Sequence, residues 1–383
     1  MPRVVNGSYS TEAKEFGNTI DIPVPTAVST IDVTPSNTPP ASSGSTPGLV
    51  QLQLNKWKQN DPIHLTDNEL TQIDKNKHFL PMQMSEALKS LANDVNVDIH
   101  NNYRNLSNGV FGATGTAGTT PFATTVAAAT QGRKLLSQQL APKTDRRGIL
   151  DFDAEANALE LSPFADAEKT MSSMVKIEGE IGRKYGIDWM SDDAVLTHTA
   201  GTLDNGTIAA ANVNNGAGYA IGASSVNIDE TSLTGTIVLG DVISFAGHSQ
   251  TYCVIENTSS AEYSGAGDVT TGVYTAASNA ITGLSFYPAL VAAVADNEVM
   301  TLTATHVVNM VMHRDAMAYA TRPLAVASTD LELGSKIQSM QDPVTGLILR
   351  LEVSRQHKQV VWEFDILWGS KLVRPELAAR VLG

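Results

Sequence analysis

The middle third of the sequence lacks basic residues. Between Lys184 and Arg314 there is no Lys or Arg, although the 383-residue chain carries 26 of them. The whole chain has a net charge of −14, whereas a protein whose main task is to grip nucleic acid needs clustered Lys and Arg for the phosphates. The composition therefore argues against a dedicated nucleic-acid-binding protein.

Cysteine and long apolar runs are scarce as well. Cys253 is the only cysteine, so no disulfide can form within the chain, and a reducing compartment is the simpler expectation. We expect Cys253 to be a small buried apolar residue on a strand. The first residues, MPRVVNGSYSTEAKEFGNT, lack the apolar stretch of a secretion signal, and no run approaches the roughly 18 apolar residues of a membrane span. We therefore expect neither a secretion signal nor a contact with a membrane.

Motifs for common chemistry are missing too. No Gly-Lys pair occurs, so there is no P-loop, and H-E-x-x-H, C-x-x-C and G-x-S-x-G are absent. GAGYAIG (216–222) is one residue too long for a dinucleotide loop. His306 and His313 could share a helix face and bind a metal, but no third ligand is near, which favours two ordinary histidines. Asp192 and Asp193 indicate a solvated turn or cap. We expect no catalytic residue, no metal ligand and no cofactor.

Two alternating runs near the N-terminus predict a pair of strands. In NTIDIPVP (18–25) and GLVQLQLNKW (48–57) the apolar residues lie two apart, so each run directs them to one face. The segment between them, TPSNTPPASSGSTPG (34–48), disfavours regular structure. A two-stranded ribbon is only marginally stable alone in water, so it needs another surface. That surface is either a neighbouring subunit or the edge of this chain's own domain, and the sequence leaves both open.

The strongest helical pattern spans residues 84–106. Apolar residues recur there at spacings of three and four, on one face: Met84, Leu88, Leu91, Val95, Ile99, Tyr103 and Leu106. Ser85 could cap the start, and Gly109 follows the end. At a rise of about 1.5 Å per residue, a helix of this extent would be roughly 33 Å long. We expect a second helix in TVAAATQGRKLLSQQLAP (125–142), ending before the proline, and a short strand in DRRGILDF (145–152). This mixture favours α+β over a regular βαβ alternation.

The cation-free region predicts a separate β module. From about Leu196 to Leu302, short β-like runs alternate with Gly, Asn and Ser turns, which is typical of a small antiparallel barrel or sandwich. Ordinary charge returns near Val307, and LILRLEV (347–353) and QVVWEFDIL (359–367) indicate paired strands. The module therefore interrupts a host domain, which is tolerated where the ends of the insert lie close together.

The chain has, in order, two N-terminal strands, a long helix, an α+β body, an inserted β module and closing strands. This order resembles that of the major capsid protein of a tailed bacteriophage with the HK97-like fold. More specifically, it resembles that of the coat proteins of short-tailed phages related to a well-studied Salmonella phage, which carry an inserted β-barrel domain. The residues that carry the resemblance are GDVISFAG (240–247) with TYCVIENT (251–258), GEIGRKYGIDWMSDDAVLTHTAG (179–201), HVVNMVMHRDAMAYATRPL (306–324) and FDILWGSKLVRPELAARVLG (364–383).

The resemblance implies a division of the chain. An N-terminal arm would comprise 1–18, and an extended-loop hairpin at 19–66 would lie on a neighbouring subunit. The HK97-like α+β core would comprise 67–200 and 303–383, with a spine helix at about 84–108, and the outward-facing antiparallel β-barrel 201–302. The candidate inter-subunit contacts are Ile20, Ile22, Val24, Val50, Leu52, Leu54 and Trp57. Relatives carry a further stretch before the arm strand, which implies either a shortened arm here or a start further upstream.

The implied function is assembly rather than catalysis. Copies would form the hexamers and pentamers of an icosahedral shell, a virion component assembled in the host bacterial cytoplasm that encloses double-stranded DNA without sequence-specific binding. Further partners would be a scaffold protein, a portal protein and a cement or decoration protein. NGVFGATGTAG (108–118) is a candidate hinge for shell expansion, with an ordinary surface loop as the alternative. Ion pairs between the inserted module and its neighbours would have to draw cations from elsewhere, for example Lys176, Arg183 or Arg314.

Two other classes of protein stay open. A phage or bacterial surface adhesin or fibre component would also be acidic and poor in cysteine, but it predicts β-repeats throughout and no long helix. An enzyme with an inserted β domain predicts clustered polar residues at strand ends, which the sequence does not offer.

Overall fold

The structure is a computed structural model. It describes the following residues: 1–9, 17–26, 28, 30, 32–33, 35, 46–73, 79–104, 112–165, 179, 181–265, 272–324, 335–343 and 345–383. None of the helices in this part of the chain combines the length and the apolar character needed to cross a membrane.

The longest helix is α3 (Phe79–Asn101), which continues as the short 3-10 helix η1 (Asn102–Arg104). It begins five residues before the predicted start, so Ser85 lies inside the helix and the prediction that it caps the start is wrong. The apolar stripe is buried as the spacing predicts: Leu91, Val95, Ile99 and Tyr103 are at most 1% exposed. Leu106 and Gly109 lie outside the described residues.

The other helices in the part of the chain that the structure describes are short. They are α2 (Asp67–Ile73), α4 (Ala127–Gln138), α5 (Phe152–Glu160), α6 (Ser162–Ala165) and the 3-10 helices η2 (Arg314–Ala316) and η4 (Pro375–Leu377). The predicted second helix, which ends before Pro142, is α4.

A seven-stranded sheet forms the centre of the host domain. Its order is β5-β24-β19-β6-β8-β7, and β9 also pairs with β19. The strands are β5 (Ala113–Gly115), β6 (Arg146–Leu150), β7 (Gly182–Lys184), β8 (Ile187–Ser191), β9 (Thr197–His198), β19 (His306–His313) and β24 (Ala378–Leu382). Helix α4 packs on this sheet so closely that a Cβ at Gly132 would lie 3.0 Å from Val311.

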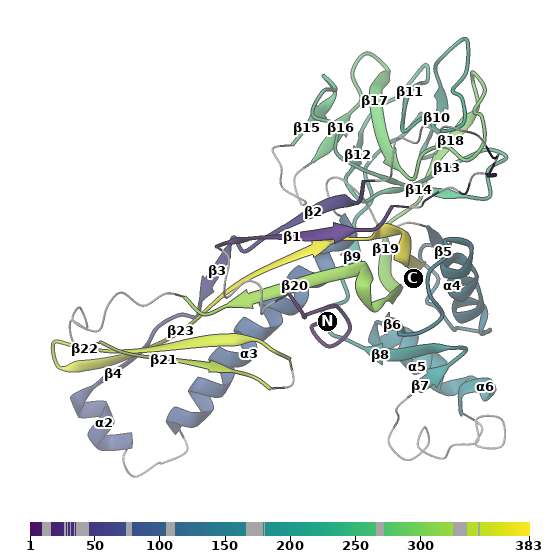
Figure 1. Ribbon diagram of the computed structural model, residues 1–383. Coiled ribbons are helices and arrows are strands. Elements are labelled where there is room, and N and C mark those ends of the chain that lie inside the picture. The colour runs from purple at the N-terminus through teal and green to yellow at the C-terminus, as the bar shows by residue number, and fades with distance from the viewer. Residues whose placement is uncertain are drawn as a thin grey trace.

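A second sheet extends along α3 (Figure 1). The long strand β23 (Gln359–Leu372) pairs on one side with β22 (Ile348–Gln356) and β20 (Met317–Arg322), and on the other with β3 (Lys56–Gln59) and β4 (Ile63–Thr66). Strand β21 (Ser335–Gln341) pairs with β22. The predicted pairing of the two closing strands is confirmed by the register of β22 and β23.

The predicted N-terminal hairpin is also present. Strand β1 (Thr19–Val24) pairs antiparallel with β2 (Gly48–Gln53), with Ile22 opposite Val50 and Ile20 opposite Leu52. Before the hairpin, Met1, Val4 and Val5 are buried in the main core that α3 and the seven-stranded sheet share. The first residues of the segment expected to be an arm are therefore part of the folded body.

The cation-free segment folds as a closed antiparallel barrel above the host domain (Figure 1). The barrel order is β10-β11-β17-β14-β13-β18, and a small sheet β12-β16-β15 adjoins it. These strands are β10 (Ala210–Val213), β11 (Ser225–Asp229), β12 (Thr236–Val238), β13 (Val242–Phe245), β14 (Thr251–Val254), β15 (Tyr263–Ser264), β16 (Val273–Thr275), β17 (Ala280–Tyr287) and β18 (Val299–Leu302).

The barrel has a hydrophobic core separate from that of the host, and its apolar residues alternate along the strands as they do on a sheet with one buried face. Its two ends meet at the host sheet, because His198 at the end of β9 lies opposite His306 at the start of β19. The prediction of an inserted antiparallel barrel, with its ends close together on the host, is confirmed.

Candidate functional site

The hairpin residues predicted as inter-subunit contacts divide into buried and exposed ones. Ile20, Ile22, Leu52 and Leu54 are at most 4% exposed, and they pack against Leu367 of the chain's own β23. Of the two surfaces that the sequence leaves open for the hairpin, the structure shows the chain's own domain. The apolar face of the hairpin is covered by the same subunit, because β20, β23 and the residue after β23 present small and apolar side chains there: Ala318, Ala320, Leu367 and Val373.

The remaining candidates are more accessible. Val24 and Val50 are partly buried at the margin of the same cluster. Trp57 is 61% exposed, although its indole Nε1 donates a hydrogen bond of 3.0 Å to Asp365 Oδ2. Asp365 in turn accepts from Arg350 Nε at 2.9 Å. Contact of any of these residues with a neighbouring subunit stays a prediction.

The strand that follows the hairpin is fixed to α3 by ion pairs. Lys56 donates to Asp98, and Lys58 lies 3.0 Å from Asp94, one turn earlier on the same helix face. Asp98 also accepts hydrogen bonds from Trp368 Nε1 at 2.9 Å and from Ser370 Oγ at 2.7 Å. One carboxylate thus joins β3, α3 and β23.

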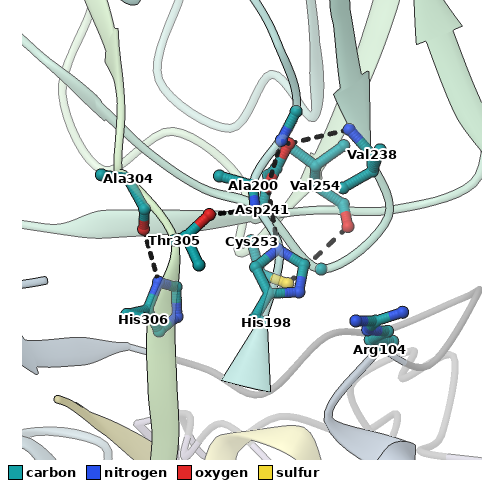
Figure 2. A network of polar contacts seen from close by, with 12 residues as sticks. Arg104, His198, Ala200, Val238, Asp241, Cys253, Val254, Ala304, Thr305 and His306 are labelled. Carbon is teal, nitrogen blue, oxygen red and sulfur yellow. Dashed lines mark hydrogen bonds and ion pairs between the residues drawn. The ribbon is translucent and has the colours of Figure 1, made fainter. Parts of the chain in front are cut away.

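A buried polar network joins the barrel to the host domain (Figure 2). The Asp241 side chain, at the start of β13, is fully buried and lies 2.8 Å from His198 Nε2. It also accepts from the backbone N–H groups of Val238 at 2.7 Å and Gly201 at 3.2 Å. His198 Nδ1 lies 3.2 Å from the hydroxyl of Tyr103 on η1. This network links α3, β9 and the barrel.

The geometry fixes the protonation of His198. A carboxylate can only accept, so Nε2 carries the proton that it donates to Asp241, and a neutral ring then accepts at Nδ1 from Tyr103. Burial lowers the pKa of His198, and the Asp241 carboxylate opposes that shift. Burial also lowers the pKa of His306 to about 4. Burial therefore favours the neutral imidazole at both positions.

Arg380 of β24 is the second anchor of this junction. Its guanidinium is fully buried and donates to the backbone carbonyls of Gly240 at 2.5 Å and Tyr103 at 2.9 Å. It also lies 4.9 Å from the centre of the Tyr103 ring and 3.2 Å from the Cys253 sulfur. Cys253 is buried on β14, as predicted, and burial raises the pKa of its thiol, so it is not a reactive thiolate.

Several carboxylates of the barrel accept hydrogen bonds from neutral donors. Asn212 donates to Glu230 at 2.6 Å, and Asn214 donates to Asp229 at 2.7 Å. Glu298 accepts from a backbone N–H three residues earlier at 2.8 Å. Amide groups donate to these carboxylates where Lys or Arg would do so in other proteins. These carboxylates therefore have hydrogen-bond donors although the module has no basic residue.

The residues weighed for metal or acid-base chemistry have structural surroundings. His306 and His313 lie on strand β19, not on a helix, and a spacing of seven on a strand directs them to opposite faces. Within the described part of the chain, no three His, Cys, Asp or Glu side chains are placed to hold a metal ion. Asp192 accepts from the backbone N–H of Ala194 at 2.8 Å, as expected of a turn. Its carboxylate is not solvated, however, because it also pairs with the Met1 ammonium at 2.9 Å and accepts from Asn96 at 2.6 Å.

The candidate hinge after α3 falls partly on a sheet strand. Residues 105–111 lie outside the described residues, but Ala113–Gly115 forms β5, which pairs in parallel with β24. The backbone N–H of Ala113 also donates to Thr251 Oγ1 of the barrel at 2.9 Å. The second half of the predicted hinge segment is therefore anchored on both sides.

Comparisons with known proteins add a likeness in fold. No protein-family model and no curated protein matches the sequence. A solved chain from Mycobacterium phage Che8 is similar over 99% of this chain and 89% of its own, with a TM-score of 0.51 and 12% identity. The capsid of cyanophage P-SCSP1u gives a TM-score of 0.48 at 11% identity, covering 100% of this chain and 86% of its own. The capsid of the Myoviridae phage XM1 gives 0.41 at 9% identity, covering 100% and 90%.

The TM-score of 0.51 over nearly the whole chain shows a shared fold, and at 12% identity the likeness shows the fold alone. The chain therefore has the HK97-like fold, an α+β architecture with an inserted antiparallel barrel, as the resemblance in sequence implied.

Proposed function

We propose that the protein is the major capsid protein of a tailed bacteriophage. Its copies would assemble into the hexamers and pentamers of an icosahedral shell around double-stranded DNA, and the protein would be a structural virion component rather than an enzyme. The observation that carries this proposal is the HK97-like fold over nearly the whole chain. Two further similar structures, the capsids of P-SCSP1u and XM1, are particles of the same kind.

The proposal includes the division of the chain and its partners. The arm (1–18), the extended loop (19–66), the core (67–200 and 303–383) and the barrel (201–302) have the roles that the resemblance implies. Within this class, the inserted barrel supports a likeness to the coat proteins of short-tailed phages that carry such a domain. Besides other copies of itself, the subunit would meet a scaffold protein, a portal protein and a decoration protein.

The alternatives fit the structure less well. An adhesin or fibre component predicts β-repeats throughout, whereas helix α3 runs for 23 residues across the second sheet. An enzyme with an inserted domain predicts a set of catalytic side chains, whereas the buried charged groups at the barrel, Asp241 and Arg380, are held by His198 and by backbone groups.

Negative-stain electron microscopy tests the proposal. The recombinant protein is purified by size exclusion, alone and with the candidate scaffold protein of its phage. We expect closed shells or rings of subunits, because each subunit repeats the same heterologous contacts until they close. A clean monomer at every concentration, with and without the scaffold protein, would refute the capsid assignment.

A pair of variants then tests the hairpin contacts. Trp57 is large, exposed and next to the hairpin, and aromatic residues of this kind often dominate interfaces. We expect Trp57→Ala to reduce shell formation while lowering the stability of the free subunit by at most about 1 kcal/mol. Val299→Ala on the barrel, where the side chain is 41% exposed, is the matched control. Equal assembly of both variants would show that Trp57 lies outside the contacts.

A further inference from the structure

The strands of the seven-stranded sheet bring four distant segments together at one end. In the observed register, the starts of β6, β8 and β24 lie beside the ends of β7 and β19. We call this end the distal end, because the barrel joins the opposite end, where His198 pairs with His306. The distal end comprises residues 133–147, 182–188, 313–315 and 374–376.

Charge is separated along this sheet. The distal end holds nine Lys and Arg and four Asp and Glu, in a chain whose net charge is −14. The barrel segment 201–302 holds nine Asp and Glu and no Lys or Arg. The basic residues of the distal end are Arg133, Lys134, Lys143, Arg146, Arg147, Arg183, Lys184, Arg314 and Arg374. An acidic module and a basic surface thus occupy opposite ends of one sheet.

Few of these cations are neutralised within the subunit. Arg374 pairs with Glu376 at 2.8 Å, and Arg183 lies 3.7 Å from Asp188. Among the residues that the structure describes, no carboxylate lies within 4.0 Å of the charged nitrogens of the other exposed or half-exposed members. Those members are Arg133, Lys134, Lys143, Arg147, Lys184 and Arg314.

Two of these cations, Arg133 and Arg146, are also close enough to affect each other. The Arg133 guanidinium reaches the turn between β7 and β8, where its Cζ would be 4.0 Å from a Cβ at Gly186. Arg146 is buried and donates only to neutral acceptors, the carbonyls of Pro142 and Ala141 and the Ser137 hydroxyl. Its pKa is lowered by burial and, in addition, by the positive charge of Arg133. Positive charges this close repel one another, which raises the free energy of the isolated subunit.

We infer that the distal end is a contact surface for the phosphates of duplex DNA. A row of closely spaced phosphates neutralises several crowded cations at once and releases their counterions, with no demand on base sequence. This inference rests on the proposed function, which supplies the DNA inside the shell. It gives the subunit a basic surface for the DNA and an acidic barrel directed away from it.

The other polyanionic surface at hand is the barrel of a second copy, and it is less suited. Asp241 is fully buried there, and Glu230, Asp229 and Glu298 already accept hydrogen bonds from amide and backbone donors. Part of the accepting capacity of these carboxylates is therefore already used. Duplex DNA carries one phosphate charge per roughly 1.7 Å of its axis, a denser row of anions than these separate carboxylates, which is why duplex DNA is the favoured partner.

Fluorescence anisotropy with a labelled 20-base-pair duplex tests the inference on the full-length, unassembled subunit between about 25 and 200 mM NaCl. The variant R133E/K134E is compared with K89E/K336E, which changes the net charge equally at exposed lysines on α3 and β21. We expect wild-type binding that weakens with salt, at least tenfold weaker binding for R133E/K134E at 50 mM, and a salt slope smaller by about 2. K89E/K336E is expected within about threefold of wild type. R133Q/K134Q should show a smaller loss in the same direction.

Three results would overturn the inference. One is no DNA binding by the folded wild-type subunit at 25 mM salt, and another is an equal loss in both charge-reversal variants. The third is unchanged DNA binding by R133E/K134E together with weaker self-association in sedimentation velocity, which would assign the distal end to a second copy's barrel. Shell formation is scored separately by microscopy. If the wild-type protein forms shells but its unassembled subunit does not bind DNA, this inference is refuted and the proposed function stands.

Discussion

At the scale of single residues, Arg380 holds the barrel and the host domain together. Its guanidinium supplies the donors for two buried carbonyls, of Gly240 and Tyr103, from different parts of the chain. Arg380→Ala leaves both acceptors unpaired and opens a cavity, so we expect a loss of about 3 kcal/mol in the free energy of unfolding. Urea denaturation of the unassembled subunit measures it.

The matched control is Arg355→Ala. Arg355 lies 2.8 Å from Asp67, and both side chains are largely exposed, at 60% and 46%. An exposed pair of this kind contributes roughly 0 to 1 kcal/mol. If both arginine variants lost the same stability, the junction would contribute no more than a surface ion pair, and the role given to Arg380 would be wrong.

His100 makes the stability of the subunit depend on pH. It is fully buried on α3, Nε2 donates to the carbonyl of Val308 at 3.0 Å, and burial lowers its pKa from 6.5 to about 4. Between these two values the unfolded chain binds a proton that the folded chain does not. Stability therefore falls as the pH drops from 6.5 toward 4, by about 3 kcal/mol for this group alone.

The measurement is the urea midpoint of the subunit between pH 7.5 and 4.5. We expect His100→Asn to have a flatter pH dependence than wild type, although it is less stable at neutral pH. The exposed His357, changed to Asn, serves as the control and should keep the wild-type slope. Parallel curves for wild type and His100→Asn would contradict the assignment.

At the scale of elements, Asp98 fixes the position of α3 on the second sheet. It accepts from Lys56, Trp368 and Ser370, and its side chain is only 14% exposed. Asp98→Ala leaves these three donors without an acceptor, so we expect a loss of about 2 to 3 kcal/mol. Asp94→Ala, one turn away, breaks the exposed pair with Lys58 and should cost at most about 1 kcal/mol.

Thermal and urea unfolding of the two aspartate variants give this comparison directly. A similar small loss for both would mean that the apolar stripe of α3 alone positions the helix. A larger loss for Asp94→Ala would reverse the argument, because it would place the important contact at the exposed end of β3.

Strands whose apolar and polar residues alternate in sequence were predictable, whereas the segments that cover their apolar faces were not. The spacing of Ile20 and Ile22 predicts a strand with one apolar face, but not that Leu367, some 345 residues later, covers it. The early start of α3 had a local indication in Pro81, since proline is tolerated in the first turn of a helix. Arg380 within the apolar run AARVL is the indication that could have pointed to the junction, although nothing local names its acceptors.

At the scale of the whole molecule, composition predicted the inserted module better than its attachment. A segment rich in Gly, Thr and Asn without Lys or Arg indicates many short strands that need no ion pairs. The junction depends on Tyr103, His198, Asp241 and Arg380, which are far apart in sequence and meet only in the fold. The charge separation along the sheet likewise follows from strand register, not from any local run.

The separate hydrophobic core of the barrel leads to a last prediction. We expect residues 199–305, expressed alone, to fold as a cooperative unit, because the barrel closes on itself and Asp241 keeps its backbone donors Gly201 and Val238 within the fragment. A cooperative urea transition and well-dispersed amide resonances would support it. The complementary chain, with 199–305 replaced by a short glycine linker, tests the host domain.

The linker variant should fold too, since His198 and His306 are paired neighbours in the observed register and a short turn can join them. It should be less stable than the full chain, because Arg380 loses the Gly240 carbonyl, while Tyr103 remains as an acceptor. If neither piece unfolds cooperatively, the junction belongs to one indivisible folding unit and the barrel is not a separate module. If both do, the polar network determines how the barrel is oriented on the host and is not required for either part to fold.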